Sequence, residues 1–231
     1  MAYVLGYWYA DGNVLDATKS TRGKYSSVTS TDRETVFNFK SLLDSRHKIS
    51  ESFRAIHVNS RRQYTLRIGS RELYDSLLDK GLRPNKSLIM TFPKIPSRFL
   101  ADFVRGYFDG DGCVHIEKSR GKNKQIILKR LRTIFTSGSK KFLASLRIKL
   151  EKNTGLIDGL LTFSHRSFQL IYPTSESVKL FKFLYKNVGE PLFLKRKLLI
   201  FLDYFEMRPQ RVDNEVAGII RCFKRPRGEV V

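Results

Sequence analysis

Apolar and polar positions follow the same succession of periods in both halves of the chain, and this duplication predicts the architecture. Segments with apolar residues at helical spacing alternate with segments in which every second residue is apolar. In the first half, the elements expected are a helix, two strands, a helix, two strands and a helix, at 2–11, 14–17, 25–30, 33–43, 48–58, 63–69 and 71–81. Asp32 and Ser70 are expected to cap the second and third helices.

The second half repeats this order and adds one helix. Its elements are expected at 99–110, 113–118, 131–137, 140–152, 156–164, 167–172, 175–187 and 193–207, with Ser139 as a helix cap. Two prolines interrupt TFPKIPSR, which is therefore the expected connection. We predict an α+β fold of two pseudo-symmetric αββαββα repeats, with boundaries at 1–92, 93–98 (the linker), 99–207 and 208–231 (a basic extension with one short helix).

Each repeat begins with an apolar helix that ends on a carboxylate and a glycine, in YVLGYWYADG at 3–12 and FVRGYFDGDG at 103–112. Small residues four positions apart lie on one face of each helix: Gly6 and Ala10, and Gly106 and Gly110. Small side chains on that face allow two helix backbones to approach closely. If the two helices pair in parallel, their C-terminal ends meet and Asp11 lies beside Asp111.

The expected juxtaposition of Asp11 and Asp111 predicts a divalent-metal site. Two carboxylates at the negative ends of two helices repel each other and the helix dipoles. A divalent cation relieves that repulsion, and hard oxygen ligands next to phosphate favour Mg²⁺. Such a metal activates water and stabilises the leaving oxygen of a phosphodiester. One Asp-Gly pair alone is typical of a turn, but repetition of the whole unit favours the catalytic interpretation.

The charge of the chain predicts a polyanionic partner. There are 43 Lys and Arg residues against 22 Asp and Glu, a net charge of +21, and both halves share the excess. Cations spread through a whole fold indicate nucleic acid. No apolar run is long enough to span a bilayer, and Asp11 interrupts the apolar N-terminal segment, so we expect neither a membrane span nor a signal peptide.

Cysteine usage predicts a reducing, intracellular compartment. Cys113 and Cys222 are the two cysteines of the chain, and neither lies in a disulfide framework or a metal-binding pattern. The four histidines show no metal-ligand spacing either. We therefore expect free thiols, a structural His115, and no zinc site.

The segments VLGYWYADG (4–12) and VRGYFDGDG (104–112) resemble the nine-residue signature of the LAGLIDADG homing endonucleases, in its single-chain, two-motif form. The resemblance extends over about residues 2–207 through the duplicated element order. The signature's glycines, small seam residues and metal-binding acids match Gly6 and Gly106, Ala10 and Gly110, and Asp11 and Asp111. Its earlier, non-catalytic aspartate is Asp109 in the second copy but Tyr9 in the first.

This resemblance implies a saddle of two antiparallel sheets in the DNA major groove, with the motif helices at the domain interface. It implies that each acid cuts one strand, leaving 3′ overhangs, and that the carbonyls of Ala10 and Gly110 complete metal ligation. A basic residue is implied near each cleavage centre, with Lys86 and one of Lys195 or Lys197 as candidates. The implied protein is a monomer on double-stranded DNA that uses Mg²⁺, with Mn²⁺ as a substitute and Ca²⁺ supporting binding without cleavage.

Polar positions on the predicted strands and hairpin tips are the candidate DNA contacts. Most are expected to contact phosphate, and Arg and Gln can also read base edges. Alternation within 25–30 predicts that the even-numbered positions face the groove. The candidates are Lys19, Arg22, Lys24, Ser26, Val28, Ser30, Arg54, His57, Asn59, Arg61, Arg62, Gln63, Arg67, Lys118, Arg120, Lys122, Lys124, Gln125, Lys129, Arg130, Arg132, His165, Arg166 and Gln169.

Two other functions are compatible with the same fold. An intron RNA maturase or a non-cleaving DNA-binding regulator could keep the architecture, but retention of both acids and of the small seam residues favours cleavage. An intein-associated nuclease would carry splicing residues at its ends, and these are absent. The first hypothesis is therefore a site-specific double-strand DNA endonuclease that recognises a long, asymmetric site.

Overall fold

The duplicated order of elements is confirmed in the computed structural model, which describes residues 1–16, 23–53, 62–120, 126–189 and 192–223. The first half contains α1 (Ala2–Asp11), β1 (Gly12–Val14), β2 (Ser26–Ser30), α2 (Arg33–Leu42), β3 (Ile49–Ser52), β4 (Gln63–Ile68) and α3 (Arg71–Asp79). The second half contains α4 (Leu100–Asp111), β5 (Gly112–Arg120), β6 (Ile126–Ser137), α5 (Lys140–Thr154), β7 (Leu160–Ser164), β8 (Ser167–Tyr172), α6 (Thr174–Tyr185), α7 (Lys195–Met207) and α8 (Asn214–Phe223).

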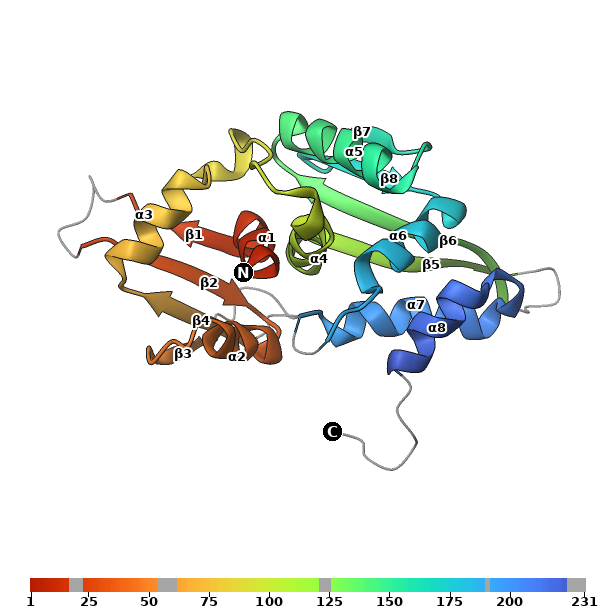
Figure 1. Cartoon of the computed structure of the whole chain (residues 1–231), viewed down its shortest axis with the longest axis horizontal. Helices are drawn as coiled ribbons and strands as arrows, with labels where there is room; N and C mark the ends of the chain where they lie inside the picture. The colour runs from red at the N-terminus through yellow and green to blue at the C-terminus, as the bar shows by residue number, and fades with distance from the viewer. Residues whose placement is uncertain (17–22, 54–61, 121–125, 190–191, 224–231) are drawn as a thin grey trace, which may run out of the picture.

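Each half has one four-stranded antiparallel sheet, and the strand order is the same in both: β1-β2-β4-β3 and β5-β6-β8-β7. The registers also correspond, because Gly12 pairs with Val28 and Gly112 pairs with Phe135. Helix α2 packs against β2 and β4, and α5 and α6 pack against the second sheet. Figure 1 shows the two halves on either side of α1 and α4, so the predicted α+β, pseudo-symmetric fold is confirmed.

Helices α1 and α4 meet at the predicted seam of small residues. A Cβ atom added to Gly6 would lie 2.0 Å from the carbonyl oxygen of Phe103, and one added to Gly106 would lie 2.0 Å from that of Tyr3. The two contacts are equivalent under the duplication, because Gly106 corresponds to Gly6 and Phe103 corresponds to Tyr3. The backbones therefore touch along this face, and only glycine fits at either position.

The glycine that follows each motif acid is required by close packing. Gly12 and Gly112 have extended backbone with φ of −79° and −94°, which any residue can adopt. A Cβ at Gly12 would lie 2.1 Å from the Trp8 ring, and a Cβ at Gly112 would lie 2.2 Å from the Phe108 ring. The motif helix thus passes directly into the first strand of its sheet beneath its own aromatic side chain.

Two of the three predicted helix caps are confirmed. The hydroxyls of Ser70 and Ser139 accept hydrogen bonds from the amides of Leu73 and Phe142. The prediction for Asp32 is wrong in part: it precedes α2, but its side chain makes no capping bond. Its carboxylate binds a residue of the other half instead, as described below.

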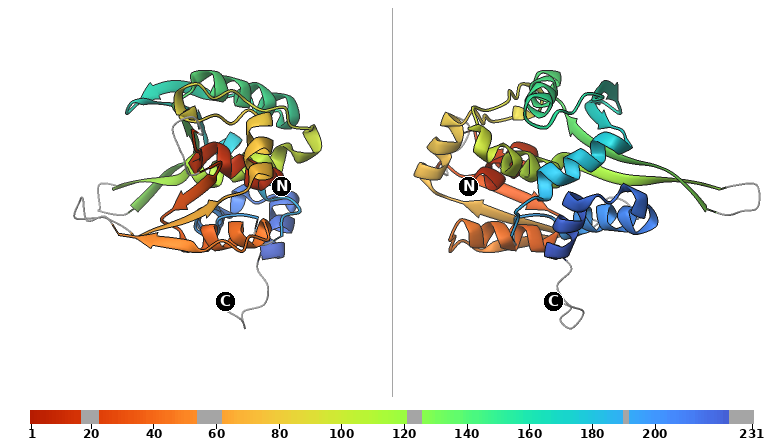
Figure 2. Two further views of the ribbon diagram at one scale, coloured as in Figure 1. Left: turned by 90° about the vertical axis from the view of Figure 1, so that its left-hand side faces the viewer. Right: turned by 45° about the vertical axis from the view of Figure 1, so that its right-hand side comes forward.

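The observed strands differ from the predicted ones chiefly in the hairpins. The first strand lies at Gly12–Val14 rather than 14–17, because the ladder with β2 begins directly at the end of α1. β5 and β6 are longer than expected and form a hairpin that extends beyond the rest of the second half (Figure 2). The segment after α7 contains α8, whose Val216 and Ile219 are buried. None of the helices in the described ranges combines the length and apolarity needed to cross a membrane.

Candidate active site and nucleic-acid interface

The structure brings Asp11 and Asp111 together at the C-terminal ends of α1 and α4. A Cβ atom on Gly110 would lie 2.3 Å from the Cβ of Ala10 and 3.4 Å from a carboxylate oxygen of Asp11. The parallel pairing of the helices therefore places the two acids next to each other, as the spacing predicted. Figure 1 shows both helices between the two sheets, with each helix leading into its own sheet.

Two recesses flank the seam, and each contains one motif acid. The Asp111 recess, of about 220 Å³, is lined by Asp111, Ala10, Lys86 and Ser137, among others. The Asp11 recess, of about 300 Å³, is lined by Asp11, Gly110, Asp109, Ser30, Asp32 and Arg196, among others. Each acid thus shares its recess with the small residue that precedes the other acid, which gives two related but chemically different centres.

The environment raises the pKa of both acids. The pKa of Asp111 is raised to about 7, first because protein surrounds the carboxylate and second because Asp11 repels its charge. Solvent reaches Asp11, but protein atoms surround much of its carboxylate, and this loss of hydration raises its pKa as well. Lys86 and Lys197 oppose both shifts. Burial therefore favours the protonated form of both acids, and the two lysines only partly offset it.

Two buried lysines bind the C-terminal carbonyls of the motif helices. Lys86 Nζ donates to the carbonyl oxygens of Ala10, at 2.9 Å, and Gly12, at 2.7 Å. Lys197 Nζ donates to those of Asp109, at 2.9 Å, and Gly112, at 2.5 Å, and also to Phe108. Each lysine belongs to the same half as the helix it binds. Both ammonium groups offset the negative helix ends, where the acids also lie.

Burial lowers the pKa of both lysines. The pKa of Lys197 falls to about 8, and that of Lys86 also falls, with loss of hydration as the largest cause in each. Nearby aspartates, chiefly Asp109 for Lys197 and Asp111 for Lys86, act in the opposite direction. The ammonium groups of Lys86 and Lys197 are thus incompletely hydrated, and they lie next to the predicted catalytic centre at Asp11 and Asp111.

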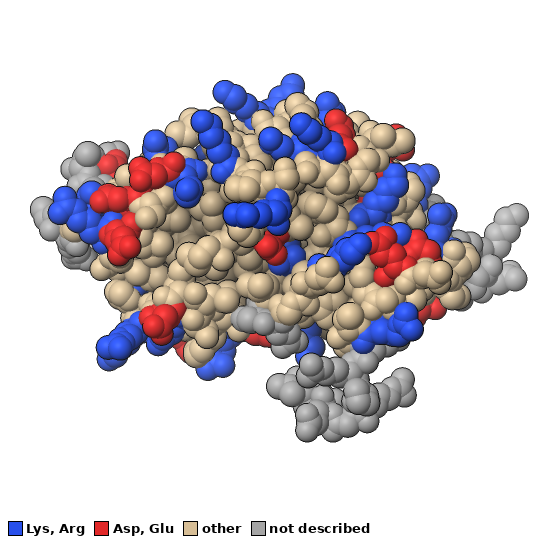
Figure 3. All heavy atoms as spheres, in the orientation of Figure 1, with Lys and Arg blue, Asp and Glu red and all other residues tan. Residues whose placement is uncertain are grey.

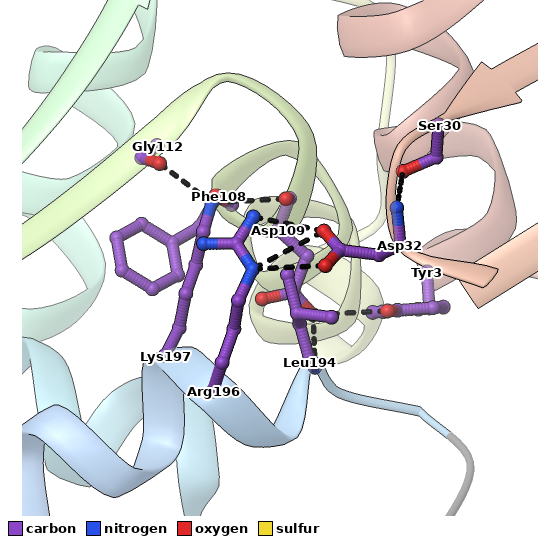
Figure 4. Close-up of polar contacts among 9 residues, drawn as sticks. All are labelled: Tyr3, Ser30, Asp32, Phe108, Asp109, Gly112, Leu194, Arg196 and Lys197. Atoms are coloured by element: carbon purple, nitrogen blue, oxygen red, sulfur yellow. Dashed lines mark hydrogen bonds and ion pairs between the residues drawn. The ribbon is translucent and has the colours of Figure 1, made fainter. Parts of the chain in front are cut away.

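The structure separates the two candidates at the start of α7. Lys197 points to the motif helix (Figure 4), whereas Lys195 is exposed. Two positions along an α-helix are about 200° apart, so the two side chains leave opposite faces. Of the two alternatives, Lys197 is therefore the candidate beside the motif, and Lys195 lies on the exposed face of the helix.

Asp109 and Tyr9 occupy equivalent positions but make different bonds. The buried carboxylate of Asp109 accepts hydrogen bonds from the Tyr3 hydroxyl, at 2.9 Å, and from the Leu194 amide, at 2.8 Å (Figure 4). Tyr9 donates to the carbonyl oxygen of Lys80 at 2.6 Å. Loss of hydration raises the pKa of Asp109 to about 6. Asp109 thereby ties α1, α4 and the start of α7 together, which positions Lys197.

An ion pair that the sequence analysis missed joins the two halves beside Asp11. The guanidinium of Arg196, on the first turn of α7, donates to both carboxylate oxygens of Asp32 at 2.9 to 3.2 Å (Figure 4). No sequence pattern could have paired residues 164 positions apart. Both residues line the Asp11 recess, and no basic residue takes the equivalent place before Lys86, where Asn85 stands.

This ion pair should add little to stability. Both side chains are partly exposed, so water screens the attraction. We expect a double-mutant cycle of Arg196→Ala and Asp32→Ala, measured by urea unfolding, to give a coupling of about 0.5 to 1 kcal/mol that decreases with added salt. A coupling well above about 2 kcal/mol would contradict this screening argument.

The donor set at the seam fits a hard divalent cation. It offers two carboxylates and nearby backbone carbonyls, all oxygen donors. Across the described ranges, no three His, Cys, Asp or Glu side chains cluster as a zinc-like site would require. Both cysteines are free. Burial is the largest cause of the raised pKa of both Asp11 and Asp111, and a cation bound by their carboxylates would oppose it.

The outward face of the first sheet is polar, but its phase in β2 is opposite to the predicted one. Val28 is fully buried and pairs with Gly12 and Leu66, so the prediction that it faces DNA is wrong. Ser26 is also buried, for the same reason. A shift of one residue exchanges the two faces of a strand. The half-exposed residues of β2 are Ser27, Thr29 and, at the end of the strand, the predicted Ser30.

Other candidates of the first half have mixed placements. Arg62, Gln63 and Arg67 are exposed at or along β4, although Arg62 lies 3.1 Å from Glu51. Lys24 forms an ion pair with Asp75 of α3 at 2.6 Å, and Ser30 lines the Asp11 recess. Lys19, Arg22, Arg54, His57, Asn59 and Arg61 lie outside the described residues.

In the second half, the predicted polar residues follow the outward face and the hairpin. Lys118 and Arg130 are exposed, and Arg132 pairs with Glu117 at 3.1 Å. His165 and Arg166 form the exposed turn between β7 and β8, and Gln169 is half-buried on β8. Lys122, Lys124 and Gln125 lie outside the described residues, and the side chains of Arg120 and Lys129 are not described. His115 lies on β5, opposite Arg132.

On the side of the molecule that carries the helices, the Lys and Arg side chains do not gather in one patch. Figure 3 shows Lys and Arg side chains interspersed with Asp and Glu on this side of the molecule. Such a surface does not by itself indicate where a polyanion binds. The outward faces of the sheets, next to the acids, are the surface on which the candidate contacts converge.

Comparison with known proteins supports this arrangement. The model of the LAGLIDADG-like domain family matches residues 1–80 and 98–157, which include both motif helices. No curated protein matches the chain in sequence.

Solved structures share the fold at low sequence identity. The homing endonuclease I-WcaI bound to its DNA recognition sequence aligns with a TM-score of 0.62 and 12% identity, covering 85% of this chain and 84% of that chain. The meganuclease I-SmaMI bound to uncleaveable DNA with a TTCT central four gives 0.57 and 14%, covering 96% of both. The LAGLIDADG meganuclease I-AabMI bound to uncleaved DNA gives 0.51 and 13%, covering 98% of both.

Proposed function

Because the chain belongs to the LAGLIDADG-like domain family, we propose that it is a site-specific, double-strand DNA endonuclease of the homing type that acts as a monomer. One observation carries the proposal: the duplicated helices bring Asp11 and Asp111 together between two sheets. The structural neighbours described above include proteins bound to DNA. The two halves differ in sequence, so the site recognised should be long and asymmetric.

The residues at the seam would hold Mg²⁺. Asp11 and Asp111 would provide carboxylate oxygens, and Ala10 and Gly110 would provide carbonyl oxygens next to them. When bound, the metal supplies a water nucleophile and stabilises the leaving oxygen. Mn²⁺ should substitute, and Ca²⁺ should support binding without cleavage. Lys86 donates a hydrogen bond to the carbonyl oxygen of Ala10 in the structure. If that oxygen bound a metal, the lysine would have to move away or share the oxygen with the metal.

The roles of the protein's own side chains follow from their positions. Lys86 and Lys197 place positive charge at the two helix ends, where a scissile phosphate would bring negative charge. Asp109 holds the start of α7 and so positions Lys197. The outward residues of both sheets would contact phosphates and base edges on either side of the cleavage point.

Selection of cleaved sites from a randomised DNA library tests the proposal directly. The purified protein should enrich one long site and linearise plasmids that carry it with Mg²⁺, but not with Ca²⁺ or EDTA. Both strands should be cut at staggered positions, leaving 3′ overhangs. Binding without any cleavage, or preference for RNA over the selected duplex, would instead favour the non-cleaving or maturase function.

We expect Lys86→Met and Lys197→Met each to slow cleavage by at least about tenfold, because each removes a charge beside the scissile phosphate. Each lysine belongs to one helix end, so the nicked intermediate should accumulate in both variants. The measurement is the rate of plasmid nicking and linearisation, followed on gels.

The matched comparison is Lys195→Met, which removes the same charge from the opposite face of the same helix turn. It should cleave at close to the wild-type rate. If Lys195→Met were slowed as much as Lys197→Met, the placement of Lys197 at the cleavage centre would be wrong. Circular dichroism melts of all three variants exclude unfolding as the cause.

A further inference from the structure

The outward face of the second sheet carries a row of apolar side chains beside Asp111. The pairing registers place Cys113, Ile134, Ile171 and Leu160 opposite one another across β5, β6, β8 and β7. Cys113 is exposed, Leu160 is 62% exposed, and the two isoleucines are half-buried. The row begins two residues after the motif acid.

These side chains do not belong to the hydrophobic core. The neighbouring row, with Val114, Thr133 and Tyr172, points the other way and is buried. Ile134, Ile171 and Leu160 are absent from the set of buried and partly buried residues packed around the core. A row of apolar side chains that packs against no core needs another explanation.

The equivalent row of the first sheet has the opposite chemistry. The duplicated registers match Cys113, Ile134 and Ile171 with Asn13, Ser27 and Arg67, which also pair across their strands. Asn13 and Arg67 are exposed, and Ser27 is half-buried. The same three positions of one architecture are therefore apolar beside Asp111 and polar beside Asp11.

The adjoining row nearer the helix-capping end of β2 and β6 does not differ in this way. Thr29 pairs with Thr65 in the first sheet, and their equivalents Thr136 and Gln169 pair in the second. On the other side of the apolar row, His115 pairs with Arg132. The apolar row thus lies between polar rows of one continuous face and is not a separate docking patch.

We propose that the apolar row reads thymine, through the C5-methyl groups that thymine presents in the major groove of the half-site next to Asp111. The proposal rests on the endonuclease function proposed above. Thymine is the base with an apolar group on its major-groove edge, and aliphatic side chains contact it. The polar row of the first sheet, with Arg67 and Asn13, reads hydrogen-bonding edges instead.

The flanking residues support duplex DNA as the occupant. The exposed cation Arg130 and the paired Arg132 lie further along the same face of β6, where they suit contacts with the phosphates beyond the bases. Contact between the isoleucines and the thymine methyl groups removes the apolar surface of each from water, which favours binding. The recognition code is therefore asymmetric: hydrophobic on one side of the cut and polar on the other.

The test begins with the site selected from the randomised library. Deoxyuridine, which lacks the methyl group, replaces thymine in one half-site at a time, and binding is measured by fluorescence anisotropy in Ca²⁺. In the half next to the second sheet, each contacted methyl lost should weaken binding by about fourfold. The same replacement in the other half should change binding by less than about twofold.

A double variant assigns the effect to these side chains. Ile134→Ser with Ile171→Ser leaves no methyl group at either position, and it should bind the thymine and deoxyuridine duplexes equally well. The matched variant Arg67→Thr should instead relax base preference in the other half and leave the deoxyuridine effect intact. Melting curves confirm that both variants fold.

Three results would overturn the inference. One is a selected half-site without thymine dependence; another is a deoxyuridine effect that persists in the double variant. The third is sedimentation showing that the row joins two copies of the protein while DNA binding is unaltered in the double variant. If the library yields no bound or cleaved site at all, the proposed nuclease function fails first, and the two failures are therefore distinguishable.

Discussion

Asp11→Asn and Asp111→Asn should each reduce double-strand cleavage by at least about a hundredfold while leaving DNA affinity nearly unchanged. Each substitution removes an oxygen anion from the seam but keeps the shape of the side chain. The measurements are plasmid linearisation with Mg²⁺ and equilibrium binding of the selected site with Ca²⁺. Asp79→Asn, at the exposed end of α3, is the matched control and should cut normally.

A second readout separates a metal-binding acid from a structural one. The pKa of Asp111 is raised in the folded protein, so the folded state binds the proton more tightly than the unfolded chain does. This group therefore destabilises the fold increasingly as pH rises from about 4 to about 7. At pH 8 without metal, Asp111→Asn should melt at a higher temperature than the wild type. Lower stability together with full cleavage would contradict the assigned role.

Gly6→Ala and Gly106→Ala should each destabilise the protein by about 3 kcal/mol or more. Each new methyl group would lie 2.0 Å from a backbone oxygen of the facing helix, and no side-chain rotation can relieve a contact with backbone. The helices would have to separate, which also moves Asp11 away from Asp111. Urea unfolding measures the loss, and cleavage should fall even where the variant remains folded.

The control for the seam is a glycine in a helix with free space around it. Gly218 lies in α8, and in the part of the chain that the structure describes no atom beyond its own helix backbone and neighbours lies within 4 Å of an added Cβ. Gly218→Ala should raise stability by about 0.5 to 1 kcal/mol, because alanine loses less backbone entropy in a helix. If Gly6→Ala were as harmless as Gly218→Ala, the close approach of the motif helices would not exist in solution.

Local sequence patterns were sufficient for the element order and for two of the three caps. Periodicity located all the main helices, and the serines before α3 and α5 were recognised because their bonds lie within three residues. The seam was predictable for a similar reason. Small residues at Gly6 and Gly106 are a direct requirement of close helix packing, and the repeat supplied the partner.

The exceptions involve choices that local patterns leave open. In SSVTS both phases carry small or polar side chains, so alternation alone could not decide which face Val28 takes; pairing with Leu66 decided it. Lys195 and Lys197 are both cationic and near one helix start, and only packing of α7 against α4 selected Lys197. The local pattern around Asp32 indicates a cap, whereas its partner in the structure, Arg196, is remote in sequence.

The sequence by itself determined the duplication, the order of helices and strands, the glycine seam and the two acids at its end, because each is encoded in neighbouring residues or in their repetition. Tertiary structure decided which lysine reaches each helix end, which side of each strand is outward, and that one sheet presents an apolar row where the other presents a polar one. Those features depend on register and on packing between distant segments, where free energy is set by contacts that no local pattern contains.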